Sequence, residues 1–309
     1  MQLIGVDYSE ISAGRGLDEL DRACREWGFF VLKNHPFSVD LRTNMLVAMA
    51  RFFAMPTDEK RRCERTANNH WGFYDRELTK NVQDWKELFD VGPAFGECVP
   101  QWPADLPGFR KVIETHYGVC ESVAIQLVRC LGAALGDDGD GLAQGFDGHT
   151  SYLRLNHYPL CDAPSPADTP TGPPAGHFGI SHHSDAGAVT VLLQDGEAGL
   201  QVEKDDQWHT IETGRGDIII NIGDVVQVWS NDRYKAPLHR VLASNTHTRY
   251  SAPFFLNPAF QTNYAPLEST AADGPARYRS INWGEFRKGR AAGDYADVGE
   301  EIQIAHYRL

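Results

Sequence analysis

The sequence predicts a mainly β fold with flanking helices (α+β), built on a β-sandwich or jelly-roll core. From residue 152 onward, short runs rich in Val, Ile, Leu and Thr alternate with Gly and Pro turns, which is typical of a sandwich or jelly roll rather than of βαβ units. In the preceding half, apolar residues recur at spacings of three and four, as on one face of a helix. The 309 residues, 42% of them hydrophobic and 11% aromatic, are enough for one large core and argue against disorder.

The first half of the chain is expected to contain helices and two short strands. Apolar residues from Leu17 to Trp27 share one helical face, and Gly28 ends that helix before an apolar run suited to a buried strand. A second helix should stop at Met55, because a residue that precedes proline is pushed out of the α region. The expected elements are a strand at 4–6, a helix at 17–27, a strand at 29–32, a helix at 39–53, a solvated charged turn at 59–65 and a core-facing helix at 117–135.

The second half is expected to be a series of closely spaced strands. These are 151–155, 189–193, 199–202, 207–211, 217–222, 225–229, 239–242 and 251–256. Residues 161–176, which include five Pro, are expected to form a surface loop. A helix at 283–290 and an extended segment at 302–309 complete the prediction.

The net charge of −13, from 29 basic and 42 acidic side chains, disfavours polyanionic partners such as nucleic acid and anionic membranes. No apolar stretch approaches the about 18 to 20 residues that span a bilayer, and residues 1–7 resemble no secretory signal. The six Cys include no C-x-x-C pair, so we interpret them as reduced thiols. We therefore expect a cytoplasmic protein, a monomer or weak homo-oligomer, that acts on a small-molecule substrate without binding nucleic acid or membrane.

His183 and Asp185 are the first candidates for chemistry. In an extended segment, residues two apart point to the same side, so this imidazole and this carboxylate can act together. A second imidazole, from His239 at the start of another expected strand, would complete the two-His, one-carboxylate set that binds non-haem Fe(II). His182 should face away from the ligands, and His177 should lie at the rim of the site.

The stretch from 183 to 258 resembles the double-stranded β-helix core of the Fe(II)/2-oxoglutarate-dependent oxygenases, in the isopenicillin N synthase-like branch. The matching segments are His183-Ser184-Asp185-Ala186-Gly187, Thr190-Val191-Leu192-Leu193-Gln194-Asp195, Gly199-Leu200-Gln201-Val202, Asn221-Ile222-Gly223-Asp224, Trp229-Ser230-Asn231, His239-Arg240-Val241 and Arg249-Tyr250-Ser251. The N-terminal part is similar through Trp27-Gly28-Phe29-Phe30, Asn34-His35, Phe52-Phe53 and Lys86-Glu87.

That resemblance implies a catalytic iron centre and a cosubstrate site. It assigns Fe(II) to His183, Asp185 and His239. It assigns the distal carboxylate of 2-oxoglutarate to Arg249 and Ser251, since a guanidinium fork suits a planar carboxylate. Asn156 and Tyr158 match the family's N-x-Y element, which also reaches the cosubstrate; the middle residue, often aromatic in the family, is here His157.

The resemblance also implies a reaction: with Fe(II), 2-oxoglutarate and O2, and ascorbate as an aid in vitro, a small organic molecule is oxidised, usually hydroxylated, with release of succinate and CO2. It implies a single catalytic domain over 1–309. Residues 1–150 would form a mostly helical region packed on the core, 151–260 the jelly-roll core with the iron and 2-oxoglutarate site, and 261–309 a C-terminal extension.

Aromatic residues are expected to form the substrate-binding wall, because small-molecule pockets are mostly apolar with a few polar anchors. The candidates are Trp71, Phe73, Tyr74 and Phe255, with Trp85 and Tyr264 as further possibilities.

Three alternatives stay open at this point. The first is an Fe(II) oxidase of the isopenicillin N synthase or aminocyclopropane-carboxylate oxidase type, which does not use 2-oxoglutarate although it shares the R-x-S motif. The second is a catalytically silent jelly-roll binding protein. The third is hydrolytic zinc chemistry, which uses the same kinds of ligand but has no other support in the sequence.

Overall fold

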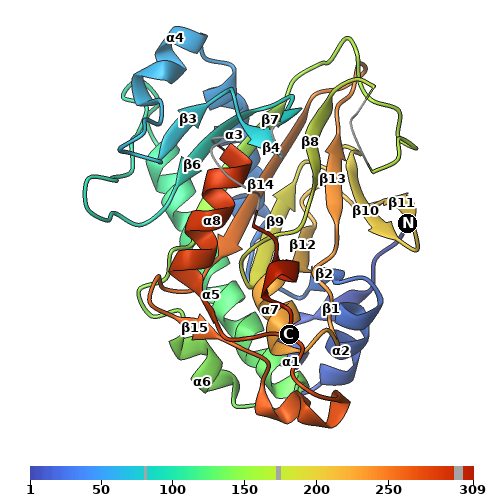
Figure 1. The fold of residues 1–309 in the computed structure, drawn as a ribbon. Helices are drawn as coiled ribbons and strands as arrows, with labels where there is room; N and C mark the ends of the chain where they lie inside the picture. The colour runs from blue at the N-terminus through green and yellow to red at the C-terminus, as the bar shows by residue number, and fades with distance from the viewer. Residues whose placement is uncertain (80–81, 172–174, 296–301) are drawn as a thin grey trace.

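A computed structural model describes residues 1–79, 82–171, 175–295 and 302–309 of the protein. Within these residues, two antiparallel sheets form a jelly roll that helices cover on one side (Figure 1). The larger sheet has eight strands in the order β1-β2-β12-β9-β14-β7-β6-β3, with only the β1–β2 pair parallel, and the smaller has four in the order β11-β10-β13-β8.

The strands of the larger sheet are β1 (Gly5–Asp7), β2 (Phe29–Lys33), β3 (Gly72–Tyr74), β6 (Glu87–Val91), β7 (Tyr152–Tyr158), β9 (Val189–Gln194), β12 (Ile218–Ile222) and β14 (Arg249–Leu256). Those of the smaller sheet are β8 (Phe178–His183), β10 (Leu200–Lys204), β11 (Gln207–Thr210) and β13 (His239–Leu242). Two further sheets have two short strands each: one pairs β4 (Leu78–Thr79) with β5 (Val82–Gln83), and the other pairs β15 (Asn263–Tyr264) with β16 (Ile281–Asn282).

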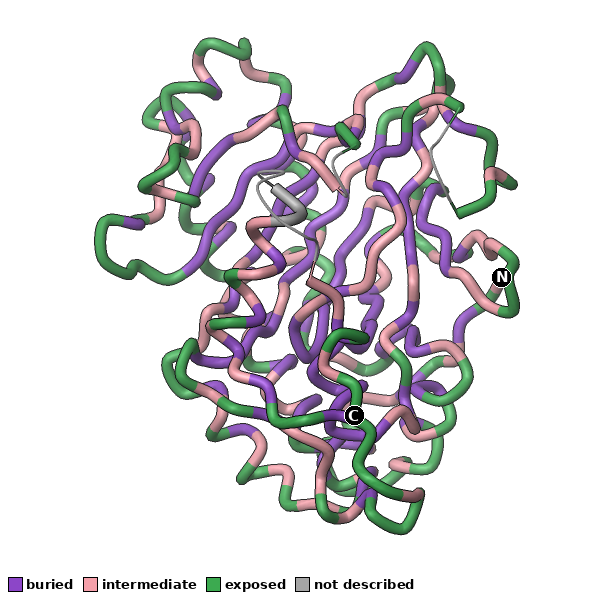
Figure 2. Tube along the Cα trace, viewed as in Figure 1, coloured by how far each residue is buried: buried purple, intermediate pink, exposed green. Residues whose placement is uncertain are grey.

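Strand β12 shows how the larger sheet separates two apolar cores. Its side chains alternate, so that Ile218 and Ile220 pack in the cluster beneath the helices while Ile219 packs in the cluster between the two sheets. Both faces of the strand are buried, which explains its uninterrupted run of isoleucines. Figure 2 shows buried residues along the strands and exposed residues in the outer loops.

Helices α3 (Val39–Phe53) and α5 (Phe109–Ala134) pack on the larger sheet, against β7, β9 and β14. Helix α3 begins where the Ser38 hydroxyl accepts the backbone N–H of Leu41, a common N-cap. The other helices are α1 (Tyr8–Ser12), α2 (Leu17–Glu26), α4 (Thr57–Lys60), α6 (Gly139–Gln144), α7 (Asp224–Trp229) and α8 (Trp283–Tyr295), with 3-10 turns η1 (Arg61–Cys63), η2 (Glu268–Asp273) and η3 (Ile304–Tyr307). None of the helices described is long and apolar enough to cross a membrane.

Most of the elements expected from periodicity are present. Helix α2 ends where expected, because Gly28 adopts a left-handed φ of 63° and turns the chain into the buried strand β2. Helix α3 has the expected bounds, and α5 starts eight residues earlier than expected (117 − 109). Seven of the eight strands expected in the second half are strands, with ends shifted by up to three residues.

Three sequence expectations were wrong. Residues 225–229, rich in Val, lie in the helix α7: the segment is buried throughout, and its tertiary packing overrides the strand propensity of the valines. The 59–65 segment is not a solvated turn: Lys60 is buried, and its ammonium lies 2.5 Å from a carboxylate oxygen of Glu87. The C-terminal segment, expected to be extended, contains η3.

The N-terminal region is less helical than expected. Four of the eight described strands of the larger sheet, β1, β2, β3 and β6, precede residue 150. The sequence missed β3 and β6, as well as β8, because short strands without a clear alternation resemble loops. The first half of the chain therefore completes the sheet rather than only packing on it.

Candidate active site

Two histidines face each other across the smaller sheet. His183, at the end of β8, is the direct cross-strand partner of His239, at the start of β13. Residues opposite each other in an antiparallel pair place their side chains on the same face. The two imidazole centroids are accordingly 4.3 Å apart.

Asp185 brings a carboxylate to the same point from the turn that follows β8. Its Oδ1 lies 3.8 Å from Nε2 of His183 and 3.7 Å from Nε2 of His239. One ligand atom from each of the three side chains falls within 4.8 Å of the others, and the other described residues contain no second such group of His, Cys, Asp and Glu. Two imidazole nitrogens and one carboxylate oxygen on one side of a point fit a divalent metal with open positions.

Neighbouring groups fix how these three side chains point. Nδ1 of His183 lies 2.8 Å from the carbonyl of Ser181, and Nδ1 of His239 lies 3.0 Å from the carbonyl of Pro237. A carbonyl oxygen can only accept a hydrogen bond, so Nδ1 of each ring carries the hydrogen. Nε2 is then unprotonated, as a metal ligand must be. These contacts are the usual support of a metal-binding histidine.

The outer oxygen of Asp185 is held from the larger sheet. Asn221 and Thr190 are cross-strand partners on β12 and β9, and both side chains donate to Oδ2 of Asp185, the amide at 2.8 Å. Oδ1 is thereby directed toward the imidazoles. The two sheets meet at this carboxylate.

The local electrostatics keep His183 and Asp185 in their metal-binding forms. Burial, and then the nearby His239, lower the pKa of His183 to about 3. Burial alone would raise the pKa of Asp185, but His239, His183 and the two hydrogen bonds to Oδ2 hold it below its usual value. At neutral pH, His183 is therefore neutral and Asp185 is charged.

The turn after Asp185 fits only small residues. A Cβ on Gly187 would lie 2.6 Å from the carbonyl oxygen of Leu256 and still closer to the side chain of Asn257. The backbone N–H of Asp224 donates to the carbonyl of Asp185 at 2.8 Å, which ties the turn to the start of α7. Close backbone packing thus sets the position of the carboxylate.

Replacing Gly187 with Ala should therefore lower the free energy of unfolding by about 1–3 kcal/mol, the usual cost of forcing atoms into a packed site. The same shift should weaken Fe(II) binding, because Asp185 is two residues away. Urea denaturation of the metal-free protein and equilibrium dialysis with Fe(II) measure the two effects. Gly118→Ala is the control, since its Cβ would meet open space on α5; equal effects of the two variants would contradict the packing explanation.

Arg249 lies in a second buried polar group, on strands β14 and β7. Its Nη2 donates to Gln194 at 2.8 Å, whereas its Nε and Nη1 are buried without a hydrogen-bond partner. Ser251 lies on the same face of β14, and its hydroxyl is 3.3 Å from both the Asn156 amide nitrogen and the Tyr158 hydroxyl. Buried N–H groups without a partner are costly, so this site is suited to bind a carboxylate.

Three other histidines lie outside the metal-binding group. His177 is exposed and stacks on Trp85 with centroids 4.8 Å apart, as a residue outside the ligand cluster. His182 is not part of the metal-binding group. His157 packs against Tyr250, on the opposite face of β7 from Asn156 and Tyr158.

Two cavities with shared walls lead to the metal ligands. The inner one has a volume of about 100 Å³ and is lined by His183 and Asp185. The outer one, of about 670 Å³, shares Tyr152, Arg154 and Arg287 with it. The shared walls indicate one elongated site that leads from the outer cavity to the metal ligands.

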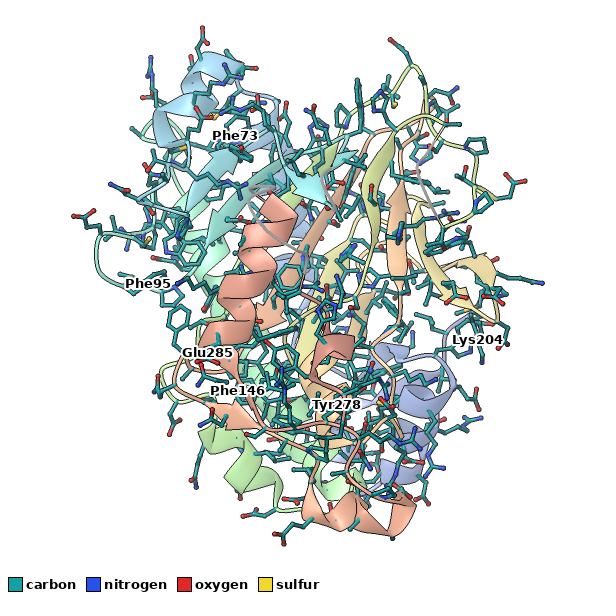
Figure 3. All side chains as sticks on the ribbon, viewed as in Figure 1. Phe73, Phe95, Phe146, Lys204, Tyr278 and Glu285 are labelled. Carbon is teal, nitrogen blue, oxygen red and sulfur yellow. The ribbon has the colours of Figure 1, made fainter. Side chains whose placement is uncertain are left out.

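The aromatic candidates divide between these cavities and the core. Trp71 and Tyr74 line the outer cavity and Phe255 lines the inner one. Phe73 does not: it is fully buried in the core, where its ring contacts Phe52 (Figure 3). Side chains alternate along β3, so Phe73 points away from the cavity that Tyr74 lines. The two further possibilities, Trp85 and Tyr264, also lie outside the lining of these cavities.

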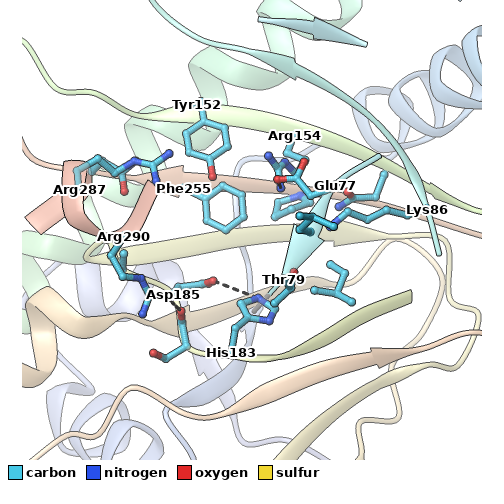
Figure 4. Close-up of a pocket in the computed structure, with 18 of the residues that line it drawn as sticks. Glu77, Thr79, Lys86, Tyr152, Arg154, His183, Asp185, Phe255, Arg287 and Arg290 are labelled. Carbon is cyan, nitrogen blue, oxygen red and sulfur yellow. Dashed lines mark hydrogen bonds and ion pairs between the residues drawn. The ribbon is translucent and has the colours of Figure 1, made fainter. Parts of the chain in front are cut away.

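Sequence reasoning missed the charged residues of the cavities. Arg154 shares a strand face with Asn156 and Tyr158, so the period of two could have identified it. Lys86, Arg287 and Arg290 also line the inner cavity (Figure 4). No local pattern distinguishes these three, because β6 and α8 meet the site only in the folded chain.

A buried ion-pair network lies beside the inner cavity. Arg154 makes two 2.8 Å hydrogen bonds to Asp90, and Arg65 lies 3.1 Å from Glu77. Burial alone would raise the pKa of Glu77, but Arg154 and Arg65 lower it. Buried charges are tolerated when they are paired in this way.

Two family models match the chain. Residues 149–258 match the 2OG-Fe(II) oxygenase superfamily. Residues 6–106 match the family described as non-haem dioxygenase in morphine synthesis N-terminal. The first match includes the three candidate metal ligands and Arg249.

Named relatives are similar over most of the chain. Jasmonate-induced oxygenase 4 of Arabidopsis thaliana is 34% identical over 281 residues, which are 88% of this chain and 77% of that protein. Gibberellin 2-beta-dioxygenase 6 of Oryza sativa subsp. japonica is 32% identical over 294 residues, 93% of this chain and 77% of that protein.

Solved structures agree with these matches. The crystal structure of JOX2 in complex with 2OG, Fe and JA has a TM-score of 0.82 and 28% identity, covering 98% of this chain and 90% of that one. The dioxygenase for auxin oxidation in rice has a TM-score of 0.76 and covers 99% of this chain and 100% of its own; at 23% identity, this second likeness supports the fold alone.

These similarities confirm the family and fold class that the sequence predicted, and they favour use of 2-oxoglutarate over the oxidase and silent-protein alternatives. The chain therefore belongs to the 2OG-Fe(II) oxygenase superfamily and is an Fe(II)- and 2-oxoglutarate-dependent dioxygenase.

Proposed function

We propose that this protein hydroxylates a small organic molecule at the site formed by His183, Asp185 and His239. The observation that carries the proposal is the convergence of one ligand atom from each of these three side chains within 4.8 Å, beside a cavity. Bound there with 2-oxoglutarate and O2, Fe(II) supplies the oxidising chemistry that inserts one oxygen atom into a C–H bond and converts 2-oxoglutarate to succinate and CO2.

The chain's own residues hold and orient the reactants. His183, Asp185 and His239 would hold the metal and leave coordination positions for cosubstrate and oxygen. Arg249 receives the distal carboxylate of 2-oxoglutarate with its two buried donors, Nε and Nη1. Ser251 adds a hydroxyl donor.

Further residues close the site. Asn156, which lines the inner cavity, and Tyr158 flank the cosubstrate through their contacts with Ser251. Phe255, Trp71 and Tyr74 form the apolar wall against which the substrate lies. Such a wall excludes water from the oxidising centre.

The domain organisation, the cellular compartment and the oligomeric state are also part of what we propose. We propose one catalytic domain over 1–309, acting in the cytoplasm as a monomer or weak homo-oligomer. All six Cys are buried and unpaired, in keeping with a reducing compartment. The net charge of −13 supports the absence of nucleic-acid and membrane partners.

An anaerobic titration tests the proposed function. Fe(II) should bind with a stoichiometry of one per chain, and 2-oxoglutarate should then produce a visible metal-to-ligand charge-transfer band. On admission of oxygen, succinate should form in proportion to 2-oxoglutarate consumed. Oxygen consumption without any turnover of 2-oxoglutarate would instead favour the oxidase alternative, and failure to bind Fe(II) would favour the silent protein.

A further inference from the structure

The lining of the two cavities is positive within a strongly negative molecule. Among the described residues, six cationic side chains line one or both cavities: Arg65, Lys86, Arg154, Arg287, Lys288 and Arg290. Their acidic lining consists of Glu77, Asp90 and Asp185. In a chain of net charge −13, this concentration of positive charge attracts anions to the cavity.

The acidic lining residues already have assigned partners. Glu77 and Asp90 are paired with Arg65 and Arg154, and Asp185 belongs to the proposed metal site. Lys86 is paired with Asp84, 2.8 Å away. The three other cations of the lining, Arg287, Lys288 and Arg290, all lie on helix α8, where Arg287 and Arg290 have contacts of their own.

Helix α8 is fixed beside the metal site. Arg290 is buried, and it donates to the carbonyl of Ser184, between two of the proposed ligands, at 3.1 Å and to Gln303 at 2.8 Å. Three residues earlier on the same helical face, Arg287 lines both cavities. Figure 4 shows Arg287 and Arg290 extending from α8 on one side of Tyr152 and Phe255, with Arg154 on the other side.

Arg287 lies where the two cavities join, since it lines both of them. Its guanidinium carbon is 6.0 Å from the centre of the Tyr152 ring. Its charge also reaches His70 in the outer cavity, whose pKa is lowered first by burial and then by Arg287 and Arg65. The positive potential thus extends across the outer cavity.

Aromatic rings connect this cation to the metal ligands. Tyr152 and Phe255 lie with centroids 4.8 Å apart, and Trp71 is 6.1 Å from Tyr152. A ring placed against Tyr152 and Phe255 lies in the cavity that Arg287, His183 and Asp185 also line. An apolar wall near both a cation and the metal site selects ligands that carry a negative charge, and it sets the direction in which they bind.

From this geometry we infer that the substrate is a ring-bearing organic carboxylic acid whose carboxylate is bound by Arg287 on α8. Lys288, exposed at the mouth of the outer cavity, adds to the attraction. The guanidinium binds the carboxylate through paired N–H donors. The inference deepens the proposed function and rests on it, since the opposite end of the ligand must reach the metal.

Binding to the anaerobic Fe(II)/2-oxoglutarate complex of the full chain tests the inference. The probes are phenylacetate, 3-phenylpropanoate and 4-phenylbutanoate, each beside its primary amide, and the readout is perturbation of the charge-transfer band. We expect at least one acid to bind about tenfold or more tightly than its amide, since a charge-assisted hydrogen bond contributes about 1.5–3 kcal/mol.

The variant Arg287→Gln should weaken binding of that acid about tenfold while changing the Kd of its amide less than about twofold. Arg287→Lys, which keeps the charge but loses the fork, should recover part of the loss. The matched control is Arg22→Gln, an equal loss of charge at an exposed position on α2, which should leave both Kd values unchanged.

The outcomes separate this inference from the proposed function. Three outcomes would overturn the inference: equal binding of acids and amides, an Arg287→Gln effect of equal size on both, or no binding of any acid. In each case an intact charge-transfer band leaves the proposed function standing. Absence of the band in the wild-type protein would remove the proposed function, and the inference with it.

Discussion

Replacing His183 with Ala should abolish iron-dependent succinate formation, whereas replacing its neighbour His182 should largely spare it. His183 supplies one of three ligand atoms that converge within 4.8 Å, and His182 supplies none of them. Loss of a residue that merely supports a metal ligand costs about 10- to 100-fold in affinity or activity, so loss of a ligand should cost more. Asp185→Ala and His239→Ala should show the same loss.

Measuring Fe(II) affinity separately from turnover makes this prediction specific. The three ligand variants should lose iron binding, with the fold retained by circular dichroism. Asn221→Ala removes only the 2.8 Å hydrogen bond to Oδ2 of Asp185, so its effect should be intermediate, about 10- to 100-fold. If His182→Ala lost as much activity as His183→Ala, the metal would be bound through a different histidine from the one proposed.

Replacing Arg249 with Ala should raise the 2-oxoglutarate concentration required for half-maximal turnover by about tenfold to a hundredfold, as expected for the loss of charge-assisted hydrogen bonds of about 1.5–3 kcal/mol. The reason is that Arg249 has two buried donors, Nε and Nη1, without a protein partner. Because Arg249 is not one of the convergent ligands, Fe(II) affinity should change little.

Two further variants separate charge from geometry at this position. Arg249→Lys keeps a positive charge but cannot offer parallel donors, so it should recover only part of the 2-oxoglutarate affinity. Ser251→Ala removes a single hydroxyl and should have a smaller effect than Arg249→Ala. A loss of iron affinity larger than the loss of 2-oxoglutarate affinity in Arg249→Ala would contradict the assigned role.

Much of this site could be read from local sequence patterns. The period of two along a strand relates His183 to Asp185 and Arg249 to Ser251, and the resemblance to a family joined these pairs to His239. The geometry agrees, since all three candidate ligands converge in the fold. The same period could have added Arg154, which shares a face with Asn156.

The substrate wall was less predictable, as two neighbours on β3 show. Tyr74 lines the outer cavity, whereas Phe73 packs in the core. Both are aromatic, and composition does not distinguish them. Which one faces the cavity depends on how β3 pairs with β6 and twists over the core.

Local sequence patterns predict the elements whose hydrophobic period is long and strong, such as α3 and the greater part of α5, and the short motifs that carry the metal ligands. Long-range packing makes 225–229 a helix, buries Lys60 against Glu87 and brings Arg287 of α8 to the cavity. The physical reason is the range of the interactions. Periodicity and strand alternation act between residues a few positions apart, whereas burial and the partner of a charge depend on segments that meet only when the chain has folded.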